Sequence, residues 1–313
     1  FFNKKSLNEM NVSFEEQIGL HFQSAKPMAL NLSGGLDSSI LLHEAYEHGK
    51  KITTYTSFYE DGNDSENSEA LLARKLSEDY NTDHQEIALN KEIYFQNLVE
   101  GYQVLDEPNY NVSIPLYHYM AKKQGVNGDG FRVLFSGDGG DEVFYGYRFY
   151  DKSHKVDRLT SILSSSFFNL IYKLKNGKKI DFSCVWDRWF FFKGWGSSFC
   201  FKQNDKNELL KYLKKSLGST FSNQIIDSND STYQLLVADR LTWLAAENFV
   251  RLDKLYMNQS MEVRAPFAYN PLRKAIDLKT STLNYPEHRK HKTWLRRHYN
   301  GKLPNYITSR KDK

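Results

Sequence analysis

The segment SGGLDSS at residues 33–39 constrains the fold more than any other part of the chain, because it lies between two apolar runs. Residues 28–32 before it are typical of a strand, and residues 40–42 after it of a helix. Glycines let the backbone approach an anion without an intervening Cβ, and the N-terminus of the following helix presents free N–H groups to that anion. Serine hydroxyls add donors, and Asp37 adds a carboxylate that can hold Mg²⁺ beside phosphates. The segment therefore predicts a loop that binds the diphosphate part of ATP.

Strands and helices alternate around this loop through residues 1–150. The alternation predicts a parallel, doubly wound α/β sheet with ligands at the carboxyl ends of its strands. From about residue 151 the alternation stops, and residues 151–313 are expected to be a mostly helical part that completes the substrate site. We expect both parts to form one domain over residues 1–313. The expected strands are 28–32, 51–58, 84–89 and 131–135, and the expected helices are 13–23, 38–48, 68–80, 91–104 and 114–123.

A second glycine-rich loop, SGDGGDE at residues 136–142, follows the apolar run 133–135. It concentrates carboxylates at the end of a predicted central strand, which costs like-charge repulsion unless a cation is present. Mg²⁺ suits oxygen ligands from one or two carboxylates together with phosphates. We therefore expect Asp37 and Asp141 to share a magnesium ion, which requires the two loops to be neighbours. The alternative is a solvated acidic turn.

The first loop resembles the SGGxDS motif of the PP-loop ATP pyrophosphatases, which have an adenine nucleotide alpha hydrolase-like fold and split ATP between its α and β phosphates. Together with later motifs in the same order, it resembles the synthetase domain of the asparagine synthetase (glutamine-hydrolysing) family. The resemblance covers almost the whole chain. The further motifs are LDEP at 105–108, SGDGGDE at 136–142, MEVRAPF at 261–267, KTWLR at 292–296 and SRKDK at 309–313.

This resemblance implies an ATP-dependent amide ligase. The family activates the side-chain carboxylate of aspartate as β-aspartyl-AMP, releasing diphosphate, and ammonia then attacks to give asparagine and AMP. Asp138 matches the catalytic acidic residue, although many members carry Glu there, and Lys313 best matches the lysine that neutralises the α-phosphate, with Lys311 as the alternative. Diphosphate and metal are then expected at Ser33, Gly34, Gly35, Asp37, Ser38 and Ser39, and adenosine at Phe58, Ser136 and Gly137.

Two further sites follow from the matched motifs. Glu262 and Arg264 are expected to contact or frame the amino-acid substrate, and the alternative is a buried structural ion pair. Lys292 belongs to a basic stretch over residues 286–297. This stretch either forms a solvated helix face or supplies a cationic wall for the triphosphate, with Lys292 foremost.

Departures from the family pattern leave the carboxylate acceptor open. The family's Pro-Phe-Leu-Asp is here Pro-Phe-Ala268-Tyr269, which loses a carboxylate, and its Phe-Gly-Gly-Tyr is here Phe-Tyr145-Gly-Tyr. Related proteins that amidate sugar uronates for surface polysaccharides, or that close an internal amide in a β-lactam or lasso peptide, keep the ATP motifs and differ in the acceptor pocket. A tRNA-modifying PP-loop enzyme and a non-catalytic nucleotide-binding module are the rivals from other classes.

Composition restricts the partners and the compartment. The apolar runs are too short for a membrane span, no signal peptide is visible, and the two cysteines suit a reducing, cytoplasmic setting. A net charge of +4 does not require nucleic acid as a partner. The chain begins with Phe1 instead of Met, so we expect a fragment whose ammonia comes from a glutaminase domain or a partner protein. The expected partners are thus small molecules (ATP, aspartate or another carboxylate, and ammonia), and a homodimer is among the open oligomeric states.

Overall fold

The computed structural model describes residues 14–107, 109, 111–162, 231–269 and 291–310, with isolated residues between 166 and 215. The chain forms two compact units. The first comprises the described residues within 1–140, 247–279 and 294–312, and the second those within 141–246 and 280–293. The predicted lysines Lys311 and Lys313 lie outside the described residues.

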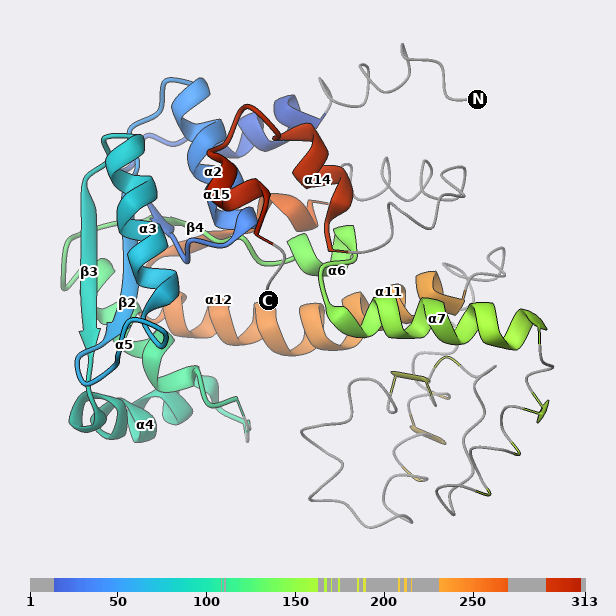
Figure 1. The fold of residues 1–313 in the computed structure, drawn as a ribbon. Coiled ribbons are helices and arrows are strands. Elements are labelled where there is room, and N and C mark those ends of the chain that lie inside the picture. Colours follow the sequence, from blue (N-terminus) through green and yellow to red (C-terminus); the bar gives the residue numbers. More distant parts are fainter. Residues whose placement is uncertain are drawn as a thin grey trace. The chain divides into compact units, whose positions relative to one another are not determined.

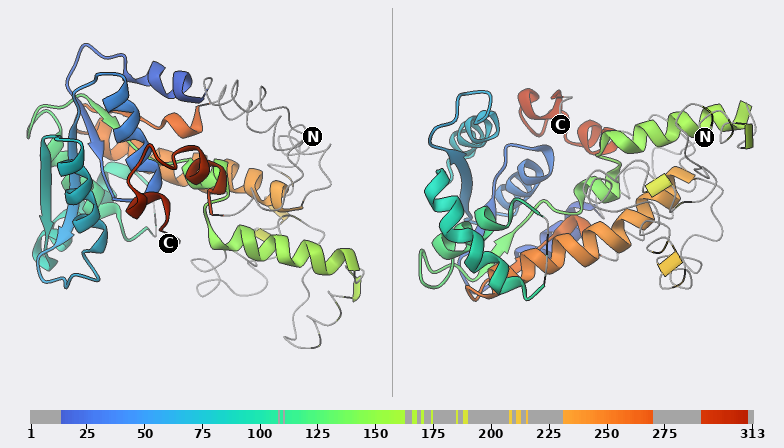
Figure 2. Two further views of the ribbon diagram at one scale, coloured as in Figure 1. Left: turned by 45° about the horizontal axis from the view of Figure 1, so that its top comes forward. Right: turned by 90° about the horizontal axis from the view of Figure 1, so that it is seen from below.

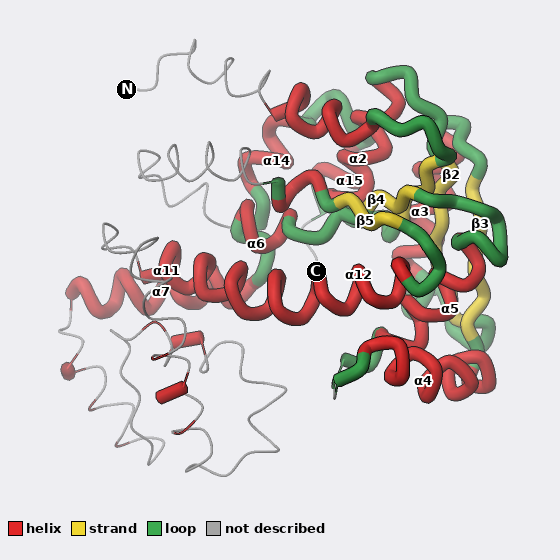
Figure 3. The backbone as a smooth tube through the Cα atoms, turned by 180° about the vertical axis from the view of Figure 1, so that it is seen from behind, coloured by secondary structure: helices red, strands yellow, loops and turns green. Residues whose placement is uncertain are grey.

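A parallel sheet in the order β3-β2-β1-β4-β5 forms the centre of the first unit. It is seen from opposite sides in Figure 1 and in Figure 3. From β1 the chain winds outward to β2 and β3, and then returns to the other side of β1 with β4. The winding direction therefore reverses between β1 and β4, which is where ligands bind in doubly wound sheets. The strands are β1 (Met28–Asn31), β2 (Thr53–Tyr59), β3 (His84–Leu89), β4 (Val133–Phe135) and β5 (Glu262–Arg264).

Helices cover both faces of this sheet. Crossovers between parallel strands are right-handed as a rule, and the winding direction reverses at β1. This places α2 (Leu36–Glu47) and α3 (Ser68–Asp79) on one face and α5 (Ile114–Gln124) on the other. α12 (Phe249–Met257) packs with α5, and the two helices share one core with the strands. Burial of such apolar side chains is the main favourable contribution to folding. The buried members of this core are Ala29, Tyr55, Ile87, Met120, Ala121, Leu134, Leu252, Tyr256 and Met261.

The expected parallel α/β sheet is confirmed, and β3 has the predicted bounds. α2 begins at Leu36, two residues before the expected start, so the helix grows directly out of the first glycine-rich loop. β5 was not expected, because one valine between two charged residues has no apolar alternation that would indicate a strand. Pairing with β4, at Leu134 opposite Val263, makes this segment a strand.

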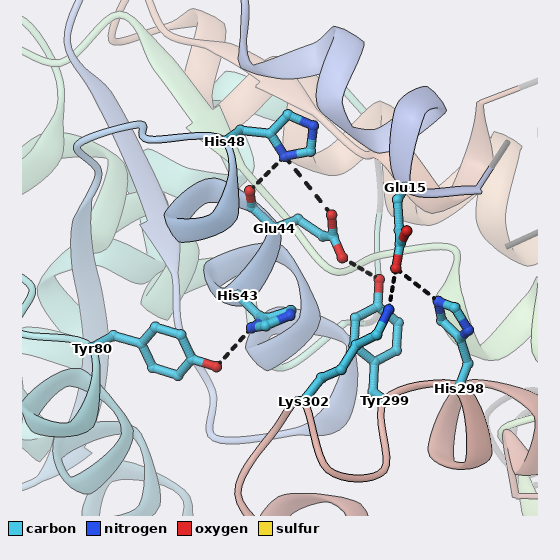
Figure 4. Close-up of polar contacts among 8 residues, drawn as sticks. All are labelled: Glu15, His43, Glu44, His48, Tyr80, His298, Tyr299 and Lys302. Carbon is cyan, nitrogen blue, oxygen red and sulfur yellow. Dashed lines mark hydrogen bonds and ion pairs between the residues drawn. The ribbon is translucent and has the colours of Figure 1, made fainter. Parts of the chain in front are cut away.

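The C-terminal part of the first unit lies against α2, as Figure 4 shows. The Tyr299 hydroxyl donates to the carboxylate of Glu44 on α2 at 2.6 Å, and both side chains are buried. Glu15, near the start of the described chain, accepts from His298 at 3.1 Å and from Lys302. The Tyr299 bond joins α2 to the segment that contains α14 (Thr293–His298) and α15 (Asn305–Thr308), and the Glu15 bonds join the start of the described chain to the same segment. The helix behind the first loop is therefore supported from a distant part of the sequence.

The second unit is helical in its described part. α7 (Arg148–Ile162) and α11 (Ser231–Asp239) run side by side (Figure 2). Tyr150 and Leu235 are among its buried core residues, and the Tyr150 hydroxyl donates to Asp239 at 2.6 Å. Along the chain, α11 leads into the π-helix η2 (Arg240–Asn248) and then into α12. No helix within the described ranges combines the length and apolar content needed to cross a membrane.

The buried Glu44 carboxylate predicts a pH dependence of stability. Burial raises the pKa of Glu44 above its usual value, so the folded chain binds this proton more tightly than the unfolded chain does. Stability from this group is complete at pH values below the ordinary carboxyl pKa of about 4.3, and is lost as the pH rises through the raised pKa. Glu44→Gln removes the titration and keeps an acceptor for Tyr299, so the variant should be more stable than wild type at neutral pH, with a smaller difference in acid.

Urea unfolding at a series of pH values measures this difference. Glu47→Gln is the matched control, because Glu47 is an exposed carboxylate on the same helix, and it should leave the free energy of unfolding within about 0.5 kcal/mol of wild type. If the free energy of unfolding depends on pH in the same way in wild type and Glu44→Gln, the raised pKa of Glu44 is contradicted.

Candidate functional site

The first glycine-rich loop connects β1 to α2 and has a backbone that only glycine fits at one position. Gly34 has a φ of +67°, in the left-handed region. A Cβ there would lie 2.7 Å from the carbonyl oxygen of Glu69 and 2.7 Å from the Cβ of Leu72, both on α3. The turn thus packs directly on the neighbouring helix.

Serine hydroxyls close this loop onto the first turn of α2. The hydroxyls of Ser38 and Ser39 donate to the carbonyl of Gly35, at 3.2 and 2.7 Å. The backbone N–H of Ser33 donates to the Ser38 hydroxyl at 3.2 Å, and the N–H of Gly35 donates to the Ser33 hydroxyl at 3.3 Å. Gly35 is the N-cap of α2 and has no side chain to cap the helix, so the first-turn N–H groups are suited to an anion.

Buried polar contacts hold the end of β1 just before the loop. The Asn31 amide donates to the Tyr256 hydroxyl on α12 at 2.9 Å. Its carbonyl oxygen accepts from the Gln124 amide on α5 at 2.8 Å. Two helices on one face of the sheet therefore position the strand from which the loop starts.

The second glycine-rich loop follows β4 and lies against Asp37 of the first. A Cβ on Gly140 would lie 2.5 Å from the carboxylate carbon of Asp37, and a Cβ on Gly137 would lie 2.9 Å from the Cβ of Asp37 and 3.1 Å from the backbone nitrogen of Ser38. Glycine at both positions lets the backbone of one loop touch the side chain of the other. The structure thereby brings together the predicted residues Asp37, Ser38 and Gly137.

The carboxylate of Asp138 is held at both oxygens. Oδ2 accepts from the hydroxyl of buried Ser136, and Oδ1 accepts from the Asn248 amide at 2.6 Å. Burial, followed by the nearby charge of Asp138, raises the pKa of Tyr117 on α5 to about 12.

The sequence did not point to Asn248. The available signal was a polar group at helical spacing within an otherwise apolar pattern, made up of Glu247, Asn248 and Arg251.

Lys292 and Asp141, predicted to contact nucleotide and metal respectively, form an ion pair in the second unit. The Lys292 nitrogen lies 2.7 Å from Asp141 Oδ1, and Lys292 is buried. Gly146 lies against the pair, since a Cβ there would lie 1.7 Å from Asp141 Oδ1. Asp37 belongs to the first unit, so a magnesium ion shared by Asp37 and Asp141 stays a prediction. In the described part of the chain, no cluster of three or more His, Cys, Asp or Glu side chains has the arrangement of a metal site.

Glu262 and Arg264, predicted to bind substrate, are paired with each other and with backbone. The Arg264 guanidinium donates to Glu262 at 2.8 Å and to the carbonyl oxygens of His21 and Gln23, at 2.6 and 2.9 Å. The Glu262 side chain is 63% exposed, and that of Arg264 is 19% exposed. In this arrangement Arg264 ties β5 to the segment before β1.

The remaining predicted residues lie near the same sheet edge or next to the second loop. Phe58 is half-buried near the end of β2. Ala268, where the sequence departs from the family pattern, lies against the second loop: a Cβ on Gly139 would lie 2.9 Å from that of Ala268. Tyr269, the other departure, packs edge-on against His21 at 4.9 Å between ring centroids.

The fold and the two loops define an α/β protein with a phosphate-type loop at the switch point of a doubly wound sheet. Comparison with known families identifies the chain more closely. The asparagine synthase family model matches residues 9–313, and the chain belongs to that family.

Curated relatives carry the name of asparagine synthetase. The chain is 24% identical over 277 residues to asparagine synthetase [glutamine-hydrolyzing] 1 of Bacillus subtilis, covering 84% of this chain and 42% of the relative. It is 27% identical over 167 residues to the human asparagine synthetase [glutamine-hydrolyzing], covering 48% of this chain and 27% of the relative. The chain thus spans less than half the length of these relatives.

A solved structure of an NH3-dependent NAD synthetase from Campylobacter jejuni, in complex with nitrate, is also similar. The identity is 15%, the TM-score is 0.31, and the match covers 82% of this chain and 97% of that one. A TM-score this low does not establish a shared fold.

Replacing Arg264 tests its structural contacts with the backbone. Arg264→Ala removes charge-assisted bonds to two backbone carbonyls, so the free energy of unfolding should fall by about 2 kcal/mol. Glu262→Ala removes only a largely exposed partner and should cost less than about 1 kcal/mol. Urea unfolding measures both; unchanged stability of Arg264→Ala would argue against the tie between β5 and the N-terminal segment.

Proposed function

We propose that this chain is the synthetase part of an ATP-dependent ligase that forms a C–N bond. In the reaction, a carboxylate attacks the α-phosphate of ATP to give an acyl adenylate and diphosphate. Ammonia then attacks the acyl carbon, the bond to AMP breaks, and an amide forms. With aspartate as the acceptor, the intermediate is β-aspartyl-AMP and the products are asparagine and AMP. Membership of the asparagine synthase family supports this reaction class.

The contact between the two glycine-rich loops is the structural observation that carries the proposal. Asp37 lies at the N-terminus of α2, and the backbone of the second loop reaches it at Gly140. An anion at this edge meets helix N–H groups whose dipole favours negative charge. Diphosphate is the fragment whose charge grows as the α–β bond breaks, so stabilising it lowers the barrier. Its proposed contacts are Ser33, Gly34, Gly35, Ser38 and Ser39, with Phe58, Ser136 and Gly137 beside adenosine.

A divalent cation fits the donor chemistry at this edge. Asp37 is a carboxylate at a place that two glycines keep clear of side chains, and Mg²⁺ prefers such oxygen donors beside phosphates. Asp37 and Asp141 are the residues proposed to hold it. When bound, Mg²⁺ would neutralise charge on the phosphates.

The remaining predicted residues are assigned acid–base, electrostatic and substrate-framing roles. Asp138 is proposed to orient or relay protons at the acyl centre, because its carboxylate is held in one orientation beside the first loop. Lys313, or Lys311 in its place, is proposed to stabilise the α-phosphate. Lys292 is proposed as a further cation for the phosphates, and Glu262 and Arg264 as residues that frame the amino acid.

A different carboxylate acceptor is the second candidate. Ala268 and Tyr269 replace the Leu-Asp of the family pattern, and Ala268 lies directly against Gly139 of the second loop. A lost carboxylate beside the acceptor alters recognition of an amino group, whereas the nucleotide loop is unchanged. A sugar uronate or an internal amide-forming substrate fits such a change.

The nitrogen source, the location and the oligomeric state are proposed by analogy with the family. The relatives are named glutamine-hydrolyzing and are longer than this chain, so a glutaminase domain or partner is proposed to supply ammonia. On the same grounds, a cytoplasmic location and a homodimer are proposed.

The acceptor can be identified by following diphosphate release. The protein is incubated with ATP, Mg²⁺ and ammonium, and with aspartate, a uronate-bearing sugar or no acceptor. Aspartate-dependent release with formation of asparagine and AMP supports the main proposal, and turnover only with the uronate supports the second candidate. If no diphosphate is released with any of these acceptors at saturating ATP, the ligase proposal is contradicted. Retention of the protein on tRNA would then favour the tRNA-modifying class.

Replacing Asp37 tests the loop contact in the reaction. Asp37→Asn keeps the shape of the side chain and removes its charge, so diphosphate release should fall by about 100-fold or more. Asp64→Asn is the control, because Asp64 is exposed in the turn between β2 and α3, and it should retain wild-type rates. Wild-type activity in Asp37→Asn would refute its assignment to the metal and diphosphate.

A further inference from the structure

The geometry around Asp138 points to a buried chain of hydrogen bonds at the start of α12 that the family match does not assign. It runs from Arg251 through Asn248 to Asp138 and is called the relay below. Asn248, at the end of η2, donates its amide to Asp138 Oδ1 at 2.6 Å and is itself buried. The two residues are 110 positions apart in the chain. Since Ser136 occupies the other oxygen, the orientation of the Asp138 carboxylate is set by Asn248 and Ser136 together.

The Asn248 amide has only one useful orientation. Its carbonyl oxygen accepts from Arg251 Nη2 at 2.5 Å. A guanidinium can only donate, and an ionised carboxylate can only accept. The amide oxygen must therefore face Arg251 and the amide nitrogen must face Asp138. Without Arg251, the amide could rotate and present its oxygen to the Asp138 carboxylate, which would be repulsive.

Two further residues contact Arg251, and a third holds one of these two. Its Nε donates to Glu247 Oε1 at 2.9 Å, one helical turn earlier, and its guanidinium carbon lies 4.9 Å from the ring centre of Tyr117. The Asn111 amide donates to the same Glu247 oxygen at 3.0 Å. The Arg251 side chain is only 4% exposed, so its charge is stabilised by these contacts rather than by water.

The local helix geometry is also unusual at this place. Nine residues, Arg240–Asn248, form a π-helix that ends where α12 begins. π-helical turns are rare and occur frequently at functional sites. The change in helical repeat occurs immediately before Phe249, so it affects the direction in which Glu247 and Asn248 project.

We propose that Asn248 is a positioning residue for Asp138 and that Arg251 acts through it by fixing the orientation of its amide. The inference rests on the proposed function, because Asp138 is the catalytic group of that reaction. The relay does not bind ATP, so its loss should lower kcat and leave the KM for ATP unchanged.

Kinetics of diphosphate release test this role. Asn248→Ala should lower kcat by about 10- to 100-fold, the usual cost of losing a group that orients a functional side chain, with the KM for ATP within about twofold of wild type. Arg251→Met should cause a similar loss although Asn248 is present. Because Arg251 acts through Asn248, the double variant should be no slower than Asn248→Ala. Additive losses in the double variant, or a rise in KM with constant kcat, would overturn the proposal.

Conservative variants and a matched control separate positioning from folding. Arg251→Lys keeps a cationic donor, so its kcat should exceed that of Arg251→Met. A folded Arg251→Lys that is as slow as Arg251→Met would count against an orienting role of the Arg251 donor. Asp253→Asn alters an exposed carboxylate on the same helix and should leave kcat unchanged. A matching loss in Asp253→Asn would mean that α12 is generally sensitive, which contradicts a specific relay.

A second measurement does not need turnover. If Asn248 contacts Asp138 as described, the Tm losses of Asn248→Ala and Asp138→Ala should be less than additive in the double variant, as for residues in contact. Additive losses would overturn the relay itself. Absence of diphosphate release by the wild type, combined with a non-additive Tm cycle, would reject the proposed function and retain the contact, so the two failures are distinguishable.

Discussion

The close approach of one backbone to Asp37 is the constraint on which the candidate site depends. β1 and β4 are neighbours in the sheet, so the loops that follow them leave at the same edge. They touch only because Gly137 and Gly140 have no Cβ: a methyl group at Gly140 would lie 2.5 Å from the carboxylate carbon of Asp37. Any larger residue would push the loops apart and separate the helix N-terminus from the second loop.

One helix supports both loops. α12 contributes Leu252 to the core beneath the sheet, and its Tyr256 hydroxyl accepts from Asn31 at the end of β1. The residue before the helix, Asn248, donates to Asp138 in the second loop. Core packing and site geometry are therefore coupled, since a shift of α12 along the sheet would disturb the ends of β1 and β4 together. The C-terminal contact between Tyr299 and Glu44 supports α2 in a comparable way.

Much of this was visible in the sequence because its signals are local. Glycine and serine within seven residues define the first loop, and alternating apolar runs define the strands beside it. β5 was missed, because Val263 is its only apolar residue and its strand conformation comes from pairing with β4. The partners of Arg264 were missed for a similar reason: it bonds the backbone carbonyls of His21 and Gln23, and a carbonyl oxygen has no sequence signature.

The amino-acid order was sufficient for the sheet class and for the two glycine-rich loops, since backbone freedom and helix N-termini act over a few residues. Folding was needed to bring Asn248 to Asp138 and Tyr299 to Glu44, because these partners are 110 and 255 positions apart. A polar side chain on a helix has many potential partners along the chain. Only the packing of that helix against the sheet selects one, through distances and directions that no local pattern encodes.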